Sequence, residues 1–244
     1  MFDTTALIII AGSLVASIFN AAFSAGGAMI ILAITSTVLP VQAIVPIHST
    51  LLIGSTLTRV MFFWEFIDWK IVIPFLLGAF FGALAGARIY IELPETVIAL
   101  AIGAVMLIAI WLPSVPWRPR LRHPWAVVGF THSLLSTLFA YGAVLHAVIL
   151  HTGLKRQQVV GTLGGCLSGM SIFKIVGYAS FGFDYSPYYH VIAAAVMVSL
   201  IGTAIGKMIV DKLSEQKFRF IFRALITVTA LRLLYVGISA IWLR

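Results

Sequence analysis

The stretch NAAFSAGGAMIILAIT, residues 20–35, lies inside an apolar run that extends from about residue 6 to residue 38. One helical membrane crossing needs roughly 20 apolar residues, so the run is too long for a single crossing. Its centre carries Asn20, Ser24 and the adjacent glycines Gly26 and Gly27. Excess length together with central glycines is typical of a helix that is broken inside the membrane, or else of one long, tilted helix.

The composition predicts an integral membrane protein. Of the 244 residues, 61% are hydrophobic and 10% are charged, whereas soluble domains carry about 25% charged residues. Alternating ten-residue strands are absent from the sequence, so we expect helices to span the bilayer. The net charge of +8 comes from basic residues beside the ends of apolar runs, which is typical of cytoplasmic loops and gives no reason to expect nucleic-acid binding.

Eight apolar segments follow one another along the chain, separated by Pro, Gly and charged residues. They are approximately 6–38, 41–63, 70–91, 96–113, 125–152, 156–179, 188–210 and 219–242. The longest polar stretch is a basic connection at 114–124, which separates a first half, 1–113, from a second half, 125–244. The first and fifth segments are the longest, at about 33 and 28 residues, and each has glycine near its middle.

The two halves match each other at a nearly constant offset. The match pairs residues 23–26 with 139–142, 39–60 with 154–175, and 82–89 with 202–209. In this register Gln42 pairs with Gln157, and Arg59 pairs with Lys174. Three matches in the same order predict an internal duplication.

The distribution of Lys and Arg favours broken first and fifth segments. If all eight segments cross, the basic residues divide without a clear bias. If segments 1 and 5 instead turn back midway, one face holds Lys70, Arg118, Arg120, Arg122, Lys155, Arg156, Lys207, Lys212, Lys217 and Arg219, and only Arg88 and Arg244 lie opposite. This arrangement obeys the positive-inside rule and leaves three full crossings in each half, so the two copies would be inverted. We therefore expect an all-α polytopic protein with two inverted repeats, each a broken segment plus three transmembrane helices.

The same segments resemble the sulfite exporter TauE/SafE family of small membrane permeases. The resemblance rests on FSAGGAMI (23–30), AIVPIHSTLLIGSTLTRV (43–60), GALAGARI (82–89), VVGTLGGCLSGMSIFKI (159–175) and GTAIGKMI (202–209). It implies a multi-pass protein of the cytoplasmic membrane that moves a small sulfur-containing or organic anion, such as sulfite, a sulfonate or sulfoacetate. It also implies coupling to an ion gradient, with a proton or sodium as the coupling ion.

A carrier for a small anion must replace its water shell, and N–H groups at a helix N-terminus are a ready supply of donors. We expect such groups at the first break, beside the polar side chains that accompany its glycines, and at the corresponding place in the second half. The candidate substrate-binding residues in the two breaks are Asn20, Ser24, Gly26, Gly27, Ser136, Tyr141 and Gly142. The alternative is that these glycines only allow helices to pack closely.

The second and sixth segments add further candidates for the substrate site. They are Gln42, His48, Ser49, Thr50 and Gln157. His48 would bind the anion, relay a proton, or donate to a neighbouring carbonyl.

Three cations are candidates for a charge or gating role: Arg59, Lys174 and Arg232. Arg59 and Lys174 lie near helix ends, and we expect them to snorkel to the interface. Arg232 lies near the middle of the last segment and therefore needs a partner or a water-lined cavity.

Other chemistry is not supported by the residue patterns. His132, His146 and His151 lack the spacing and the carboxylate of a metal site, and the single Cys166 gives neither a disulfide nor a thiolate cluster. The motifs of intramembrane or soluble hydrolases are absent from the sequence, so we expect no enzyme activity and no cofactor. The function predicted from sequence is a secondary transporter for a small anion that works by alternating access. An anion channel and a membrane-embedded subunit without transport are the alternatives, and the oligomeric state is left open.

Overall fold

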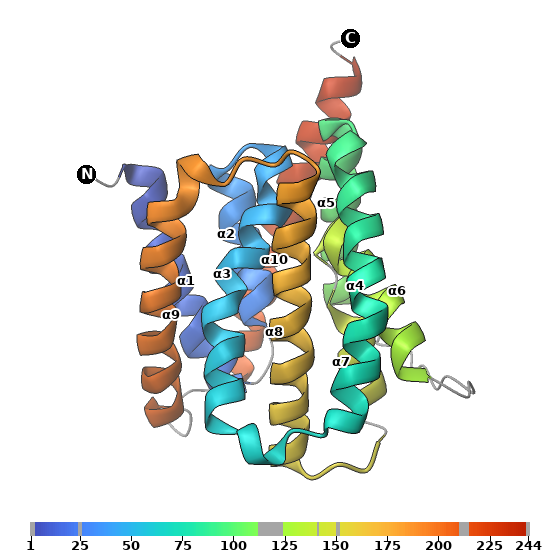
Figure 1. Cartoon of the computed structure of the whole chain (residues 1–244). Helices are drawn as coiled ribbons and strands as arrows, with labels where there is room; N and C mark the ends of the chain where they lie inside the picture. Colours follow the sequence, from blue (N-terminus) through green and yellow to red (C-terminus); the bar gives the residue numbers. More distant parts are fainter. Residues whose placement is uncertain are drawn as a thin grey trace. The chain divides into compact units, whose positions relative to one another are not determined.

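The computed structural model describes residues 3–23, 26–111, 124–140, 142–149, 152–209 and 215–242 (Figure 1). All regular structure in these ranges is helical. The α-helices are α1 (Thr4–Phe23), α2 (Gly27–Val38), α3 (Val41–Phe62), α4 (Trp69–Glu92), α5 (Glu95–Trp111), α6 (Pro124–Phe139), α7 (Ala143–Ile149), α8 (Arg156–Ser180), α9 (Tyr189–Ile209) and α10 (Glu215–Trp242). Two short 3-10 helices, η1 (Trp64–Phe66) and η2 (Ser186–Tyr188), precede α4 and α9.

The eight apolar segments predicted from the sequence correspond to these helices. Six segments form a single helix each, whereas the first forms α1 and α2 and the fifth forms α6 and α7. Among the described residues, α1, α3, α4, α8, α9 and α10 each contain a span long and apolar enough to cross a membrane, and α2 and α5 are shorter apolar helices. The prediction of an all-α polytopic membrane protein is confirmed.

The chain turns back on itself at the stretch that predicted a break. Gly26, which precedes α2, has a φ of 93°, a backbone conformation that glycine adopts without steric cost. The start of α2 at Gly27 packs on Ala16 and Asn20, whereas Gly12, nearer the beginning of α1, packs on Ile34. Residue numbers therefore run in opposite directions along the contact. The α1–α2 hairpin confirms a broken segment, and the alternative of one tilted helix is wrong.

The second half contains a corresponding hairpin. Helix α6 ends at Phe139 and α7 begins at Ala143. The Leu145 N–H in α7 donates a hydrogen bond of 3.1 Å to Nδ1 of His132, which lies in α6 seven residues before that helix ends. The contact requires α7 to lie back along α6, as α2 lies along α1.

The chain forms two compact units that cut across its two halves. Unit 1 consists of Met1–Ser55, Leu93–Leu112 and Asp184–Arg244, and unit 2 of Thr56–Glu92 and Pro113–Phe183. Unit 1 therefore combines α1, α2 and α5 with α9 and α10, and unit 2 combines α4 with α6, α7 and α8. The division of the sequence into repeats at 1–113 and 125–244, joined by 114–124, stays a prediction. In unit 1 the start of α1 and the α2–α3 connection lie at the same end of the helices (Figure 1).

Matched glycines make the same kind of contact in the two units. In unit 2, Gly82 of α4 packs against the Phe130 carbonyl of α6, and Gly86 lies one turn further along the same pair of helices. In unit 1, Gly202 of α9 packs against the Leu14 carbonyl of α1, and Gly206 follows against the Ile18 carbonyl. Both pairs of helices run parallel, and their close approach depends on glycine because a Cβ would meet a backbone oxygen.

The contacts of α8 in unit 2 establish whether its neighbouring helices run parallel or antiparallel to it. Helix α8 runs parallel to α4, since Gly165 lies at Val72, Gly169 at Leu76 and Gly177 at Ala87. The end of α3 approaches α8 in the opposite sense, with Arg59 at Gly164 and Phe63 at Gly161. The two segments that match most extensively in sequence, those of α3 and α8, therefore run in opposite directions where they meet.

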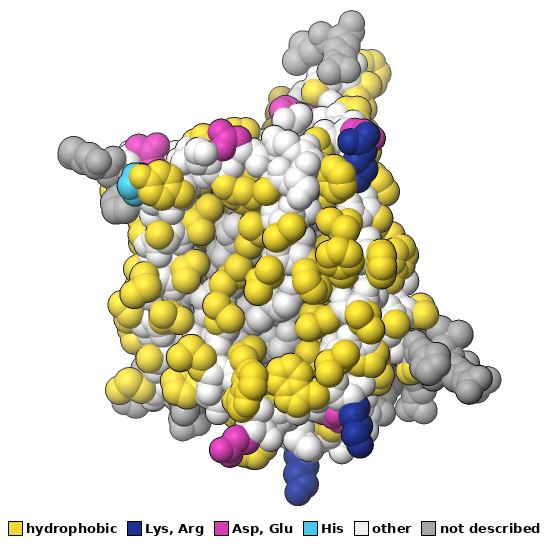
Figure 2. Space-filling model, in the orientation of Figure 1, with side chains coloured by type: hydrophobic (Ala, Val, Ile, Leu, Met, Phe, Trp, Pro, Cys, Tyr) yellow, Lys and Arg dark blue, Asp and Glu magenta, His cyan; other side chains and the backbone are white. Residues whose placement is uncertain are grey.

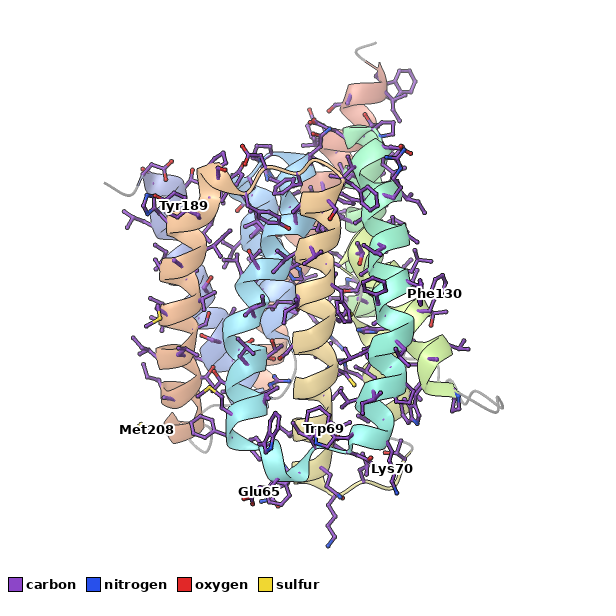
Figure 3. All side chains as sticks on the ribbon, viewed as in Figure 1. Glu65, Trp69, Lys70, Phe130, Tyr189 and Met208 are labelled. Atoms are coloured by element: carbon purple, nitrogen blue, oxygen red, sulfur yellow. The ribbon has the colours of Figure 1, made fainter. Side chains whose placement is uncertain are left out.

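The surfaces of the helices are those of a membrane protein. Hydrophobic side chains cover most of the visible lengths of the helices, and the visible charged side chains lie near helix ends (Figure 2). In unit 2, η1 and the start of α4 carry Glu65, Trp69 and Lys70 at one end of the unit (Figure 3). Trp69 packs edge-on against Trp64 with ring centroids 5.1 Å apart. Aromatic and charged residues together at a helix end are typical of the membrane–water interface.

Candidate functional site

The first polar cluster lies in unit 1 at the beginning of α2. Gly27 packs on Asn20 of α1, and Nε2 of His48 in α3 donates to the Ala28 carbonyl at 2.9 Å. The amide of Asn20 also lies 3.4 Å from the hydroxyl of Ser55, at the upper limit of a hydrogen bond. Three helices thus bring polar groups to one turn of backbone inside otherwise apolar helices.

Helix α2 begins without a side-chain cap among the described residues. The first N–H groups of a helix have no partner within the helix, and the helix dipole adds partial positive charge at the same end. Helices α1 and α2 carry no Asp, Glu, Lys or Arg. The first cluster therefore offers neutral donors to an acceptor, and it lacks the carboxylates that a cation would require.

The predicted residues of unit 1 divide into those that join this cluster and those that do not. Asn20, Gly26, Gly27 and His48 come together, while Ser24 lies outside the described residues. Ser49 and Thr50 are buried, but their hydroxyls donate to carbonyls of their own helix, those of Val45 and Ile47. Gln42 is exposed at the start of α3, outside the cluster.

The second polar cluster lies in unit 2 at the end of α6. Nζ of Lys174 donates to the carbonyl and to the hydroxyl of Ser136, at 3.0 and 3.2 Å. The hydroxyl of Tyr178, one turn further along α8, donates to the Thr137 carbonyl at 2.5 Å. Lys174 and Tyr178 therefore hold the last turn of α6 directly before the break, where a cation is favoured by the helix dipole.

Lys174 corrects one prediction. Its side chain is only 2% exposed and binds Ser136, so the expectation that Lys174 snorkels to the interface is wrong. The reason is tertiary: α6 ends beside Lys174 and supplies carbonyl acceptors, which removes the need to reach the interface. Its sequence counterpart Arg59 is half-buried in the last turn of α3, where it packs on Gly164.

Arg232 has the partner that its position required. Its guanidinium donates to the Ser36 carbonyl at 2.9 Å, so α10 holds the last turn of α2 in unit 1. The remaining predicted residues of the second half are not gathered in this way. Gly142 is half-buried before α7 and its carbonyl accepts from Nδ1 of His146, Gln157 is exposed at the start of α8, and Tyr141 lies outside the described residues.

Sequence reasoning missed three residues of these clusters. Ser55 lies one turn before Arg59 and was not selected, although its spacing from the other polar residues of α3 was visible. His132 precedes Ser136 by four residues and shares its helix face, a signal that was available. Tyr178 gave no signal, because a single tyrosine near a helix end is common in membrane proteins.

The fold is that of a multi-pass membrane protein whose broken helices bring polar groups together, a plan that recurs among membrane transporters. The chain belongs to the sulfite exporter TauE/SafE family, whose family model matches residues 8–233. It is thus a membrane transporter. A search of curated proteins and a search of solved structures gave no match.

Proposed function

We propose that the protein carries a small oxyanion across the cytoplasmic membrane by alternating access. The substrate class is sulfur-containing or organic oxyanions, with sulfite, sulfonates and sulfoacetate as the first compounds to test. The observation that carries the proposal is the meeting of Asn20 and His48 at the start of α2, which has no side-chain cap among the described residues. The family description, a sulfite exporter, supports sulfite and outward movement.

The physical reason is the cost of dehydrating an anion. An ion inside a low-dielectric slab needs several hydrogen-bond donors to replace water. The start of α2 supplies backbone N–H groups, and Asn20 adds a side-chain amide beside them. Because Gly26 and Gly27 have no side chains, an anion can approach this backbone closely. Binding by neutral donors also lets the anion leave again, which a carrier requires.

We further propose that the two halves are inverted repeats. Each half contributes a hairpin that returns to its starting side and three helices that cross, an odd number of crossings. The proposal is supported in unit 2 by the opposite directions of α3 and α8 at their contact. It is supported as well by the equivalent glycine contacts of α4 with α6 and of α9 with α1.

Counterflow in proteoliposomes tests the transport function. Vesicles that contain the purified chain are loaded with unlabelled sulfite and then given labelled sulfite outside. A carrier predicts transient accumulation of label that saturates with concentration, whereas a channel predicts non-saturating flux. The absence of flux for all three substrate types would contradict transport and favour a role as a membrane-embedded subunit.

The coupling ion is tested in the same vesicles. Sulfite uptake is measured with an imposed proton gradient and, separately, with a sodium gradient at constant pH. We expect one of the two gradients to drive uptake against the sulfite gradient. Uptake that follows the sulfite gradient alone under both conditions would contradict ion coupling.

A further inference from the structure

Helix α6 buries four polar side chains near its end: His132, Ser133, Ser136 and Thr137. The Thr137 hydroxyl donates to the Ser133 carbonyl, and Ser136 binds Lys174. Nε2 of His132 and the hydroxyl of Ser133 are buried without a hydrogen-bond partner among the described residues. Native proteins leave few buried polar atoms unpaired, so two in neighbouring residues mark a place where water or a polar ligand binds.

The hydrogen bond to α7 determines what His132 offers that ligand. The Leu145 N–H donates to Nδ1, so this nitrogen carries a lone pair and the proton of the neutral ring is on Nε2. The unpaired atom is thus an N–H donor, and His132 is 0% exposed. Phe75 packs against the ring, with centroids 5.9 Å apart, and fixes its orientation. The group that is missing beside Nε2 is an acceptor.

Lys174 adds a positive charge that lacks an acidic partner. Helices α6, α7 and α8 contain no Asp or Glu, and the Glu92 carboxylate at the end of α4 pairs with Arg88. The ionisable groups that act on His132 are the bases His146 and Lys174, and the one that acts on His146 is Arg59. The carboxyl end of α6 offsets only about half a unit of charge. When Lys174 is protonated, no carboxylate of these helices therefore neutralises its charge.

We propose that His132, Ser133 and Lys174 form an anion site in unit 2 that binds a small oxyanion. An oxyanion has several acceptor oxygens, which suits donors on three different side chains better than a single-centred halide does. The inference rests on the proposed transport of small anions, and it identifies residues of unit 2 that would meet the same class of substrate. Lys174 provides the charge, and the Nε2–H of His132 and the Ser133 hydroxyl donate the hydrogen bonds that orient the anion.

The test follows the ring nitrogens of His132 by NMR in the full chain, labelled with ¹⁵N-histidine in lipid nanodiscs. The His132 signal is assigned by its loss in H132N, whose side-chain oxygen can still accept from the Leu145 N–H. We expect sulfite to shift the Nε2 signal saturably in the wild type, and chloride to shift it only at much higher concentration. No shift at any sulfite concentration would overturn the site, and equal affinity for chloride would overturn its assignment to oxyanions.

Variants then test the charge and the hydroxyl. K174M should weaken the sulfite affinity read at His132 about 10- to 100-fold, because a hydrogen bond to a charged group is lost, while K174R should retain most of it. S133A should weaken it severalfold. The matched control is S168A. Ser168 lies in α8, about 9 Å along the helix from Lys174. Its buried hydroxyl, like that of Ser133, has no hydrogen-bond partner among the described residues. Unchanged affinity in both K174M and S133A would contradict the proposal.

The outcomes separate this site from the transport function. If counterflow is saturable but sulfite does not shift the His132 signal, the proposed anion site is rejected and the proposed transport function is retained. A sulfite-dependent shift without flux would retain the site and reject transport. Loss of the folded state in K174M does not remove the test, because the wild-type titration and K174R do not depend on that variant.

Discussion

Replacing Gly26 by alanine perturbs the turn that starts α2 with the smallest possible side chain. Gly26 has a φ of 93°, and an L-residue in the left-handed region costs roughly 1–2 kcal/mol. The free energy of unfolding of G26A should therefore fall by about 1–2 kcal/mol. Asparagine tolerates this region better than alanine, so G26N should be less destabilised than G26A.

Gly142 provides a matched control in the other half. It pairs with Gly26 in the sequence match, but its φ is not positive, and no heavy atom lies within 4 Å of an added Cβ. G142A should therefore change the free energy of unfolding by less than about 0.5 kcal/mol. The comparison separates backbone strain from the general effect of adding a methyl group at a break.

Both variants are assayed by denaturant unfolding in detergent and by sulfite counterflow in proteoliposomes. If the strain opposes formation of the turn, the equilibrium ratio of correctly formed to unformed turn falls about 5- to 30-fold, and transport falls to the extent that the unformed state becomes populated. The reasoning would be refuted by a G26A protein with wild-type stability and counterflow. It would also be refuted if G142A were as harmful as G26A, since only Gly26 has a positive φ.

Three other predictions use different measurements. Asn20→Leu should reduce sulfite counterflow about tenfold or more, because an amide donor beside α2 is lost. Thr37→Ala, a change at an exposed position of α2, should leave counterflow unchanged. Equal counterflow rates in the two variants would contradict a binding role for Asn20. In a Cys166→Ser background, cysteines introduced at Asp3 and at Pro40 should react with an impermeant thiol reagent from the same side of the vesicle, and reaction from opposite sides would contradict the hairpin. Gly82→Val and Gly202→Val should each lower the free energy of unfolding by about 1–3 kcal/mol, because each Cβ would meet a backbone carbonyl; a large effect at only one of them would argue against equivalent packing.

The positions of the helices and of the first break could be predicted from the sequence because they depend on local properties. Apolar length is fixed by bilayer thickness, and Pro40, Gly26 and the charged connections mark where helices end. The duplication added a second line of evidence for the break near Gly142, whose own sequence signal is weak. These inferences need no knowledge of which helices pack together.

The contacts of single polar residues could not be predicted in the same way. Lys174 lies six residues before the end of α8, close enough to suggest snorkelling, and only the position of the α6 terminus makes burial favourable. Gln42 and Gln157 match between the halves, yet both are exposed, so a match between the halves does not by itself identify a site residue. Ser49 and Thr50 bond to their own helix, as hydroxyls in membrane helices often do.

The two halves share the same glycine contacts with backbone, while their polar residues differ. Extending the 23–26 match back at its offset places Asn20 opposite Ser136, and the two residues contact Ser55 of α3 and Lys174 of α8. His48, by contrast, corresponds to Leu163. Lys174 donates to the end of α6, whereas its sequence counterpart Arg59 packs on Gly164. If the polar residues served packing alone, the conserved glycine contacts would favour similar side chains in both copies. The difference agrees with the proposed anion transport, because neutral donors in unit 1 bind an anion weakly enough to release it, and the Lys174 cation in unit 2 attracts one.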